Sequence, residues 1–183
     1  MVTLSTVGDA ATVVMHTTPL GPLALAATDD ALVLCCYGTA ATAAQRLSRG
    51  GLHPVGPQDE RAPGLEVLEE AREQIDAYLN GTRREFTVPV DMRLATPFSR
   101  DTNLMLAEFV PYGRTATYAQ LAGALDRPGA ARAVGTALGA NPLCVVLPCH
   151  RILPAAGGLG GYAGGPQAKR HLLAVEAPAT ASV

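Results

Sequence analysis

Three apolar stretches between residues 11 and 37 constrain the fold more than any other feature of the sequence. The stretches TVVMHT, LALAAT and ALVLCCY are separated by PLGP and DD, which are rich in turn-forming residues. Short apolar stretches joined by such turns are typical of antiparallel strands. The chain is therefore predicted to begin with an antiparallel sheet, in which Cys35 and Cys36 serve packing rather than ligand binding.

An amphipathic helix is predicted after these strands. Apolar residues recur at helical spacing while acidic residues occupy much of the remaining surface, which we interpret as a solvated face. The apolar positions are Leu65, Leu68, Ala71, Ile75 and Leu79. The segment REFTVPVD, residues 84–91, is predicted to form a short strand before a connection to the second half of the chain.

Helix signals also organise the second half. Thr96 can cap a helix with Pro97 in its first turn, and VPYG ends that helix. Thr117 and Gln120 then have capping-box spacing, and DRPG separates this short helix from another of about ten residues. Two short helices around a Pro-Gly turn predict a helix-turn-helix over about residues 117–140.

The second of these short helices has an unusual outer face. If its apolar residues pack inward, its outward positions are Arg132, Gly135, Thr136 and Gly139. Each helical glycine costs about 1 kcal/mol against alanine, so the close approach of another backbone is expected in compensation. The sequence leaves two partners open: DNA, contacted without sequence specificity through Arg132, or a neighbouring helix of the same protein.

Composition adds expectations about partners and location. Residues 1–92 carry six Arg and twelve acidic residues, whereas residues 93–183 carry eight basic and four acidic ones. Thirteen of the fourteen basic residues are Arg, which suits a polyanion partner for the second half, although GC-rich codon usage would produce the same bias. No apolar window approaches a membrane span and no secretion signal is evident, so a cytoplasmic protein with reduced cysteines is expected.

The segment VLPCHRILP, residues 146–154, places Cys149 beside His150 and Arg151. A zinc site is not expected, because adjacent residues are poorly placed to bind one ion and further ligands do not recur at short spacing. A charged pair is awkward to bury and could lower the pKa of the neighbouring thiol, which favours a reactive thiolate. The local composition does not separate this interpretation from an inert, buried thiol.

The glycine-rich segment GGLGGYAGG, residues 157–165, is not interpreted as a dinucleotide-binding site, because no apolar strand leads directly into it. Glycines at this density suit a loop whose backbone approaches a ligand. The following segment PQAKRHLLAVE is predicted to be a helix with Pro166 in its first turn, and it would close this loop.

Long motifs in register cover residues 110–176. The segment NPLCVVLPCHRILPAAGGLGGYAGGPQAKRHLLAVE resembles the active-site region of the O6-alkylguanine-DNA alkyltransferases, with their Pro-Cys-His-Arg motif, GYAGG loop and LLxxE helix. VPYGRTATYAQLA and RPGAARAVGTALGANP are similar to that family's DNA-binding segment. The resemblance implies an α/β fold, with a ribonuclease-H-like domain over residues 1–91 and a helical DNA-binding and alkyl-acceptor domain over residues 92–183.

The resemblance also implies roles in alkyl transfer. Cys149 would be the acceptor thiol, His150 would deprotonate it through a bound water, and Glu176 would orient that histidine. Tyr118 would help to rotate the nucleotide and would donate a proton to the departing guanine, and Asn141 would be a hinge before the active-site loop. Each molecule would act once, because a thioether has no easy hydrolytic exit, and no cofactor or metal would be needed.

The binding surfaces implied by the resemblance lie around the same residues. Arg132 would enter the base stack from the minor groove of double-stranded DNA that carries O6-alkylguanine, without reading sequence. The other DNA-contacting residues would be Tyr118, Ala131, Gly135 and Thr136. The lesion pocket would be formed by Tyr162, Ala163, Gly164 and Asn141, with Tyr162 also hydrogen-bonding the cysteine region. Arg151 would be a structural ion-pair partner, and a monomer with the option of cooperative assembly on DNA is expected.

Two departures from the family pattern lead to further expectations. The segment FSRDTNLML stands where the family has a helix that begins FQ and often carries a Val-Trp pair, and the chain has no Trp. We therefore expect altered packing between the two halves. Cys144 stands where proline is common in the family, so the rigidity of its loop is expected to differ.

Two other functions compete with alkyl transfer. Alkyltransferase-like proteins share this fold and bind damaged DNA without repairing it, but they replace the acceptor cysteine, and Cys149 is present. A cysteine hydrolase normally takes its base and its nucleophile from separate elements, whereas Cys149 and His150 are adjacent. The sequence therefore favours alkyl transfer over both.

Overall fold

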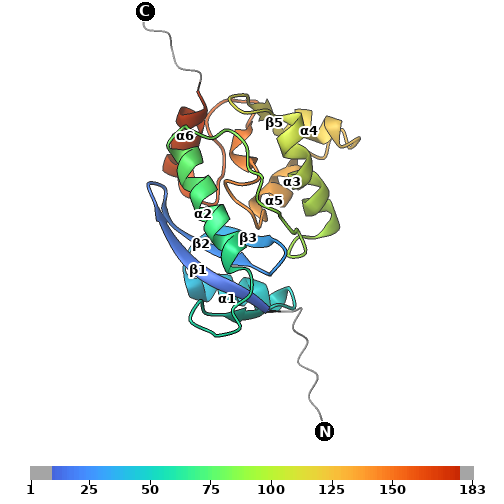
Figure 1. The fold of residues 1–183 in the computed structure, drawn as a ribbon. Helices are drawn as coiled ribbons and strands as arrows, with labels where there is room; N and C mark the ends of the chain where they lie inside the picture. Colours follow the sequence, from blue (N-terminus) through green and yellow to red (C-terminus); the bar gives the residue numbers. More distant parts are fainter. Residues whose placement is uncertain (1–9, 178–183) are drawn as a thin grey trace, which may run out of the picture.

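The computed structural model describes residues 10–177 and begins with the predicted antiparallel sheet. Strands β1 (Ala10–Thr18), β2 (Gly21–Ala27) and β3 (Leu32–Tyr37) follow one another through tight turns, as the apolar stretches indicated. A short strand, β4 (His53–Val55), pairs in parallel with β1, so the order is β3-β2-β1-β4 (Figure 1). The fold is mixed α/β, and the expected antiparallel sheet in the N-terminal half is confirmed.

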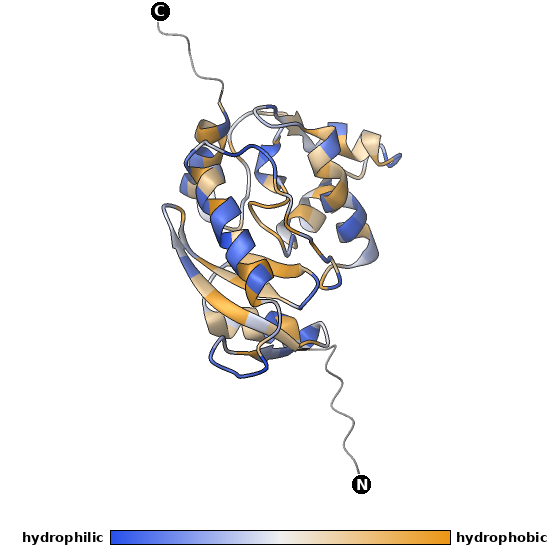
Figure 2. Cartoon of the chain, in the orientation of Figure 1, coloured by the Kyte–Doolittle hydropathy of each residue, from blue (hydrophilic) through white to orange (hydrophobic). Residues whose placement is uncertain are grey.

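Helices cover both faces of this sheet. Because side chains alternate along a strand, neighbours such as Cys35 and Cys36 enter different hydrophobic clusters. Cys36 packs with α1 (Ala40–Arg49), and Cys35 packs with α2 (Leu65–Leu79). Figure 2 shows α2 largely blue on the side that faces the viewer, which agrees with the predicted acidic outer face.

The short strand predicted over residues 84–91 is wrong. This segment is irregular apart from one isolated bridge, in which Pro89 accepts from the amide of Leu32 at 2.8 Å. The amides of Thr87 and Val88 instead bond to the side-chain oxygen of Gln74, at 2.8 and 3.2 Å. A buried carboxamide on α2 therefore satisfies backbone donors that would otherwise need a partner strand.

The helices of the second half agree with their sequence signals. Helix α3 (Pro97–Phe109) is capped by Thr96, and Thr117 and Gln120 form a complete capping box at α4 (Tyr118–Ala124). Helix α5 (Ala131–Gly139) follows the Pro-Gly turn, which completes the helix-turn-helix. Within residues 10–177, no helix combines the length and the apolar character that crossing a membrane requires.

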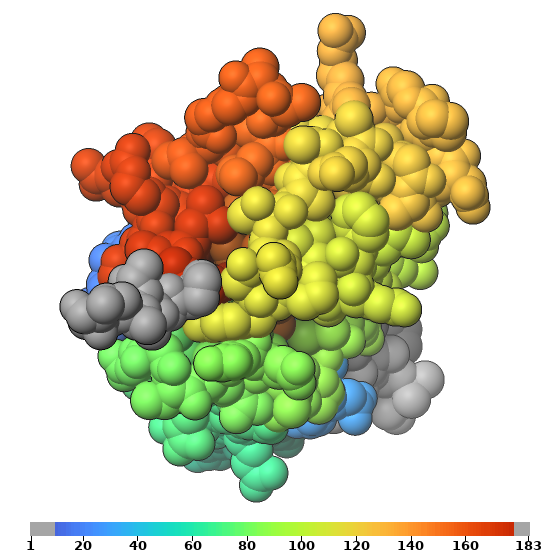
Figure 3. All heavy atoms as spheres, turned by 90° about the horizontal axis from the view of Figure 1, so that it is seen from above, coloured from blue at the N-terminus to red at the C-terminus, as the bar shows by residue number. Residues whose placement is uncertain are grey.

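The segment that carries Cys149, residues 149–153, is held by neighbouring elements. Strand β5 (Ala116–Thr117) pairs in parallel with β6 (Ile152–Leu153), which follows the 3-10 turn η1 (Cys149–Arg151). Helix α6 (Gly165–Glu176) then packs against this turn. In the view from above, the residues coloured yellow to red lie beside the green residues (Figure 3).

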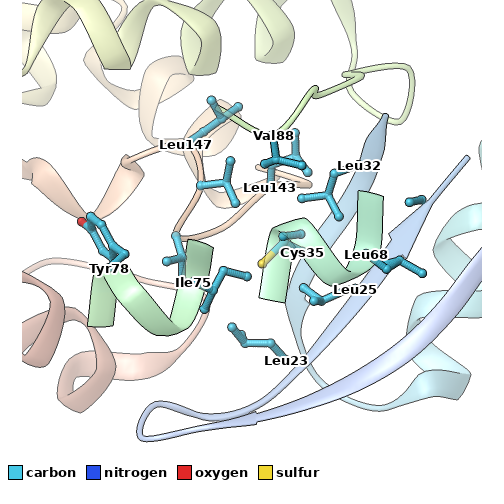
Figure 4. Packing of buried hydrophobic residues seen from close by; sticks show 14 of the residues in the cluster. Leu23, Leu25, Leu32, Cys35, Leu68, Ile75, Tyr78, Val88, Leu143 and Leu147 are labelled. Atoms are coloured by element: carbon cyan, nitrogen blue, oxygen red, sulfur yellow. The ribbon is translucent and has the colours of Figure 1, made fainter. Parts of the chain in front are cut away.

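One hydrophobic core joins the two halves. Leu143 and residues 145–147 pack with Leu23, Leu25 and Cys35 of the sheet and with Ile75 of α2 (Figure 4). The backbone follows the same path, because the amide of Cys35 donates to the carbonyl of Pro142 and the amide of Cys144 donates to that of Cys35, both at 2.8 Å. The segment that carries Cys149 is therefore fixed to the sheet on its N-terminal side, through residues 142–144.

The segment FSRDTNLML led us to expect altered packing between the halves. Its buried polar residues instead make contacts within the second half. Ser99 and Asn103 are buried on α3, where both side chains donate to the carbonyl of Ala137, at 2.9 and 3.1 Å. Ala137 belongs to α5. These residues therefore form a polar contact between two helices of the second half, because a hydroxyl and an amide there can bond the carbonyls near the end of α5.

Candidate active site

Cys149 begins the 3-10 turn after Pro148 and is 6% exposed. The amide nitrogen of Asn141 donates to its Sγ at 3.2 Å and to the carbonyl of Leu147 at 3.2 Å. The side-chain oxygen of Asn141 accepts from the amide of Leu143 at 2.9 Å. One buried side chain thus holds both ends of the segment that carries the thiol.

Groups from three parts of the fold act on the pKa of Cys149. A hydrogen bond from the thiol of Cys144 has the largest effect and lowers it, whereas burial raises it. The amide of Asn141 and the positive charge of Lys169 lower it further, so that the net shift is downward. The adjacent His150 and Arg151 direct their side chains to Glu176 instead.

His150 and Glu176 form a buried pair behind the thiol. The Nε2 atom of His150 lies 2.7 Å from Oε1 of Glu176, and both side chains are almost fully buried. Since a carboxylate only accepts, Nε2 carries the proton and Nδ1 is left as an acceptor. Nδ1 is buried and has no partner among residues 10–177. Burial lowers the pKa of His150, which favours the neutral base.

Glu176 receives donors from several elements. Arg151 donates from Nε to Oε2 at 2.8 Å, and the amide of Gly113 donates to the same oxygen at 3.1 Å. Burial alone would raise the pKa of Glu176, but hydrogen bonds from His150 and Arg151 outweigh it and lower the value to about 2. Arg151 also donates to the carbonyl of Val110 at 2.8 Å, so its guanidinium ties the turn to α6 and to the end of α3.

Two buried residues of this network were missed in the sequence. Tyr78 of α2 donates its hydroxyl hydrogen to Oε1 of Glu176, and Lys169 of α6 donates to the carbonyls of Ile152 and Gly161, at 2.8 and 3.3 Å. Lys169 is the only lysine of the chain, a signal that could have drawn attention to it. Tyr78 follows the apolar period of its helix, so the sequence indicates burial but not the partner of its hydroxyl.

A cavity of about 380 Å³ lies beside the thiol. Its lining residues come from α4, α5, the 3-10 turn and the glycine-rich segment: Tyr118, Gly135, Leu138, Gly139, Cys149, Gly161, Tyr162 and Ala163. Burial and the charge of Cys149 raise the pKa of Tyr118, so its hydroxyl stays protonated and can donate. The sequence-predicted Tyr118, Gly135, Tyr162 and Ala163 are thus brought together with the cysteine.

Three pocket residues lie differently from their expected places. The hydroxyl of Tyr162 accepts from Tyr37 at 3.3 Å rather than bonding the cysteine region. Gly164 is not among the lining residues; a Cβ there would collide with the ring of Tyr37, so this glycine permits close packing. Asn141 holds the cysteine segment from behind and does not line the cavity either.

The outer face of α5 leads into the cavity. Arg132 and Thr136 are exposed, as the sequence pattern indicated, and Ala131 is partly exposed. A Cβ at Gly139 would meet nothing within 4 Å, and one at Gly135 would make ordinary contact with the ring of Tyr118, at 3.6 Å. Close packing against another helix of the protein therefore does not explain these glycines, and the face stays open to an outside partner.

Two family models match the chain in succession. The ribonuclease-like domain of 6-O-methylguanine DNA methyltransferase matches residues 14–92, and the DNA binding domain of the same family matches residues 98–178. A methylated-DNA--protein-cysteine methyltransferase of Methanosarcina acetivorans is 34% identical over 161 residues, which are 86% of this chain and 93% of that protein. That of Mycolicibacterium paratuberculosis is 45% identical over 106 residues, but the match spans only 63% of its length and 58% of this chain.

Solved structures resemble nearly the whole chain. Mycobacterium tuberculosis OGT in complex with DNA has a TM-score of 0.72 at 36% identity, with 93% of this chain and 96% of that chain covered. The O6-methylguanine-DNA methyltransferase of the archaeon Pyrococcus kodakaraensis has a TM-score of 0.65 at 25% identity, with 91% and 98% covered.

Proposed function

The chain belongs to the 6-O-methylguanine DNA methyltransferase family, and from that premise we propose that it repairs alkylated DNA by direct reversal. In this proposal it is a methylated-DNA-[protein]-cysteine S-methyltransferase that acts as a monomer in the cytoplasm. It moves the alkyl group from O6 of guanine to Sγ of Cys149. The observation that carries the proposal is the position of Cys149, whose pKa is lowered, on the wall of a cavity large enough for a base.

The proposed reaction begins when the damaged nucleotide leaves the duplex. The alkyl carbon bonded to O6 is out of reach while the guanine is stacked in the duplex, so the damaged base must rotate out of the stack and into the cavity. Tyr118 and Ala163 border that cavity, and the exposed Arg132 of α5 is suited to fill the space that the base leaves. Contact through α5 would lie in the minor groove and would be independent of sequence. Ala131, Gly135 and Thr136 would touch the backbone of the DNA.

The proposed chemistry is a single displacement at the alkyl carbon. His150 removes the proton of Cys149 through a water at its Nδ1, an arrangement that the protonated Nε2 and the orphaned Nδ1 support. The thiolate forms a bond to the alkyl carbon while the bond from that carbon to guanine O6 breaks. Tyr118 supplies a proton to the departing guanine. The thioether on Cys149 persists, so each molecule reacts once.

Mass spectrometry of the reacted protein tests this proposal. The chain is incubated with a duplex that contains one O6-methylguanine, and its peptides are then mapped. We expect the peptide that contains Cys149 to gain one methyl group, and the variant Cys149→Ala to gain none. The matched control Cys36→Ala removes a thiol that packs in a different cluster, and it should still accept the methyl group.

Two results would overturn the proposal: a Cys149 peptide without a methyl group, or a methyl group carried elsewhere in Cys149→Ala. The alternative, a non-catalytic alkyltransferase-like protein that binds lesions, would retain the modified duplex in a binding assay while its mass stays unchanged. The lowered pKa of Cys149 speaks against that alternative, because a protein that only binds lesions has no use for a thiolate.

A further inference from the structure

A tyrosine from the N-terminal half lies inside the buried pair of His150 and Glu176. Tyr78 is 1% exposed on α2, and its hydroxyl bonds to Oε1 of Glu176 and lies 3.3 Å from Nε2 of His150. The ring is held by Phe86, with centroids 5.0 Å apart, and by Tyr112 at 6.0 Å in an edge-to-face arrangement. The hydroxyl is therefore placed firmly, although its residue precedes Glu176 by 98 positions.

The direction of the hydrogen bond follows from the charges. Burial, and next the negative charge of Glu176, raise the pKa of Tyr78, so its phenol stays protonated. Glu176 is a carboxylate and can only accept, so the hydroxyl donates to it. Oε1 thus receives the hydroxyl of Tyr78 and Nε2 of His150, and Nε of Arg151 is a third donor at 3.1 Å.

We propose that Tyr78 is a positioning residue for alkyl transfer: its hydroxyl orients the Glu176 carboxylate and weakens the hold of that carboxylate on the His150 imidazole. The inference rests on the proposed function, in which His150 is the base. It assigns the N-terminal half a part in the chemistry. Among residues 10–91, Tyr78 is the one that hydrogen-bonds to His150 or Glu176.

The consequence concerns the protonation of His150. A donor to Oε1 withdraws part of the negative charge that would stabilise an imidazolium at Nε2. Without it, the pKa of His150 rises, and the neutral base is lost at a higher pH as the solution is acidified. The charged and titratable groups that face this imidazole come from four elements: Glu176 and Lys169 of α6, Cys149 and Arg151 of the 3-10 turn, Tyr78 of α2, and Tyr162 of the glycine-rich segment.

Single-turnover methyl transfer from the O6-methylguanine duplex, measured across pH, tests this role. In Tyr78→Phe, we expect the acid limb of the rate profile to move to higher pH by about half a unit, since a fraction of one charge-assisted hydrogen bond is lost. The matched control is Tyr112→Phe. Tyr112 touches the same region and donates to the carbonyl of Val175 at 3.0 Å, so its loss removes a similar bond without touching the carboxylate. Its acid limb should stay in place.

A second variant keeps the ring and changes only the strength of the donor. A 3-fluorotyrosine at position 78 is more acidic, so it should move the acid limb to lower pH, opposite to phenylalanine. Thermal unfolding of each variant reports any loss of stability separately. An acid limb that does not move in either variant, while the wild-type protein transfers the methyl group normally, would overturn the role of Tyr78 and leave the proposed function intact. A wild-type protein that transfers nothing would instead refute the proposed function.

Discussion

At the scale of single residues, the reactivity of Cys149 depends on groups that are distant in the chain. The thiol of Cys144 lowers its pKa most, and Asn141 and Lys169 contribute in the same direction. Cys144 itself is buried, and its own pKa is raised by its hydrogen bond with Cys149. The pairing of the two buried thiols therefore lowers the pKa of Cys149 and raises that of Cys144.

Removal of the Cys144 thiol tests this division. In Cys144→Ala, the pKa of Cys149 should rise, so the thiolate fraction at neutral pH falls and alkylation by iodoacetamide slows by about three- to tenfold. The measurement is the rate of modification of Cys149 against pH, followed by peptide mapping. Cys36→Ala serves as the control and should leave the curve in place. An unchanged curve in Cys144→Ala would show that Cys144 has no such effect.

The family resemblance singled out Cys149, His150 and Glu176, whose roles stay predictions, but it did not single out Tyr78 or Lys169. Cys149 and His150 are adjacent in the chain, whereas Glu176 was implied by the LLxxE helix of the family and lies 26 positions after His150. Tyr78 lies in an apolar helical pattern, and its partners follow 72 and 98 positions later. Only the packing of α2 against α6 and the 3-10 turn brings its hydroxyl to the pair, and spacing within a sequence carries no record of that packing.

At the scale of elements, the glycines of α5 lower the stability of the helix and leave one of its faces open. Gly135 and Gly139 lower its helix propensity, and neither is required by packing inside the protein. The starts of α3 and α4 were well predicted, because the side-chain caps of Thr96 and Thr117 act locally. The strand expected over residues 84–91 failed because its amides bond to the side chain of Gln74, which is remote in the sequence.

The glycine face predicts opposite effects on stability and binding. Gly139→Ala should raise the free energy of unfolding by up to about 1 kcal/mol, because alanine is the better helix former. It should also weaken binding to duplex DNA, since the added methyl group would stand where the DNA approaches the backbone of α5. Gly123→Ala on α4 is the matched control: its Cβ also meets nothing within 4 Å, so it should stabilise the helix without weakening binding.

Chemical unfolding and a fluorescence-anisotropy titration with a labelled duplex measure the two effects. Equal DNA affinity for Gly139→Ala and Gly123→Ala would contradict a role for the α5 face in binding. A Gly139→Ala protein that unfolds more easily than the wild type would contradict the assignment of an open helical position.

At the scale of the whole molecule, the two halves are joined by a common core. Leu143 and residues 145–147 lie in the same hydrophobic cluster as Leu25 of the sheet and Ile75 of α2. The predicted boundary between residues 91 and 92 stays a prediction, although the two family models meet in the same region of the chain. Sequence motifs assigned each half its own fold, whereas the shared core depends on how the halves dock, which local patterns do not encode.

The shared core predicts that one buried leucine of the second half supports both halves. Leu143 is fully buried in this cluster, so Leu143→Ala should lower the free energy of unfolding by about 3 kcal/mol. Fluorescence and circular dichroism should record a single coincident transition during urea unfolding. The control Leu104→Ala removes a side chain that is 46% exposed and should change little. Two separated transitions in the Leu143→Ala protein would contradict a common core.

The burial of the single lysine has a practical consequence for labelling. Lys169 is 0% exposed, and its ammonium group is engaged by the carbonyls of Ile152 and Gly161. Reagents that modify amines therefore find no accessible lysine side chain on the folded protein. A label on the lysine would therefore enter only as the chain unfolds, so that lysine labelling would report unfolding.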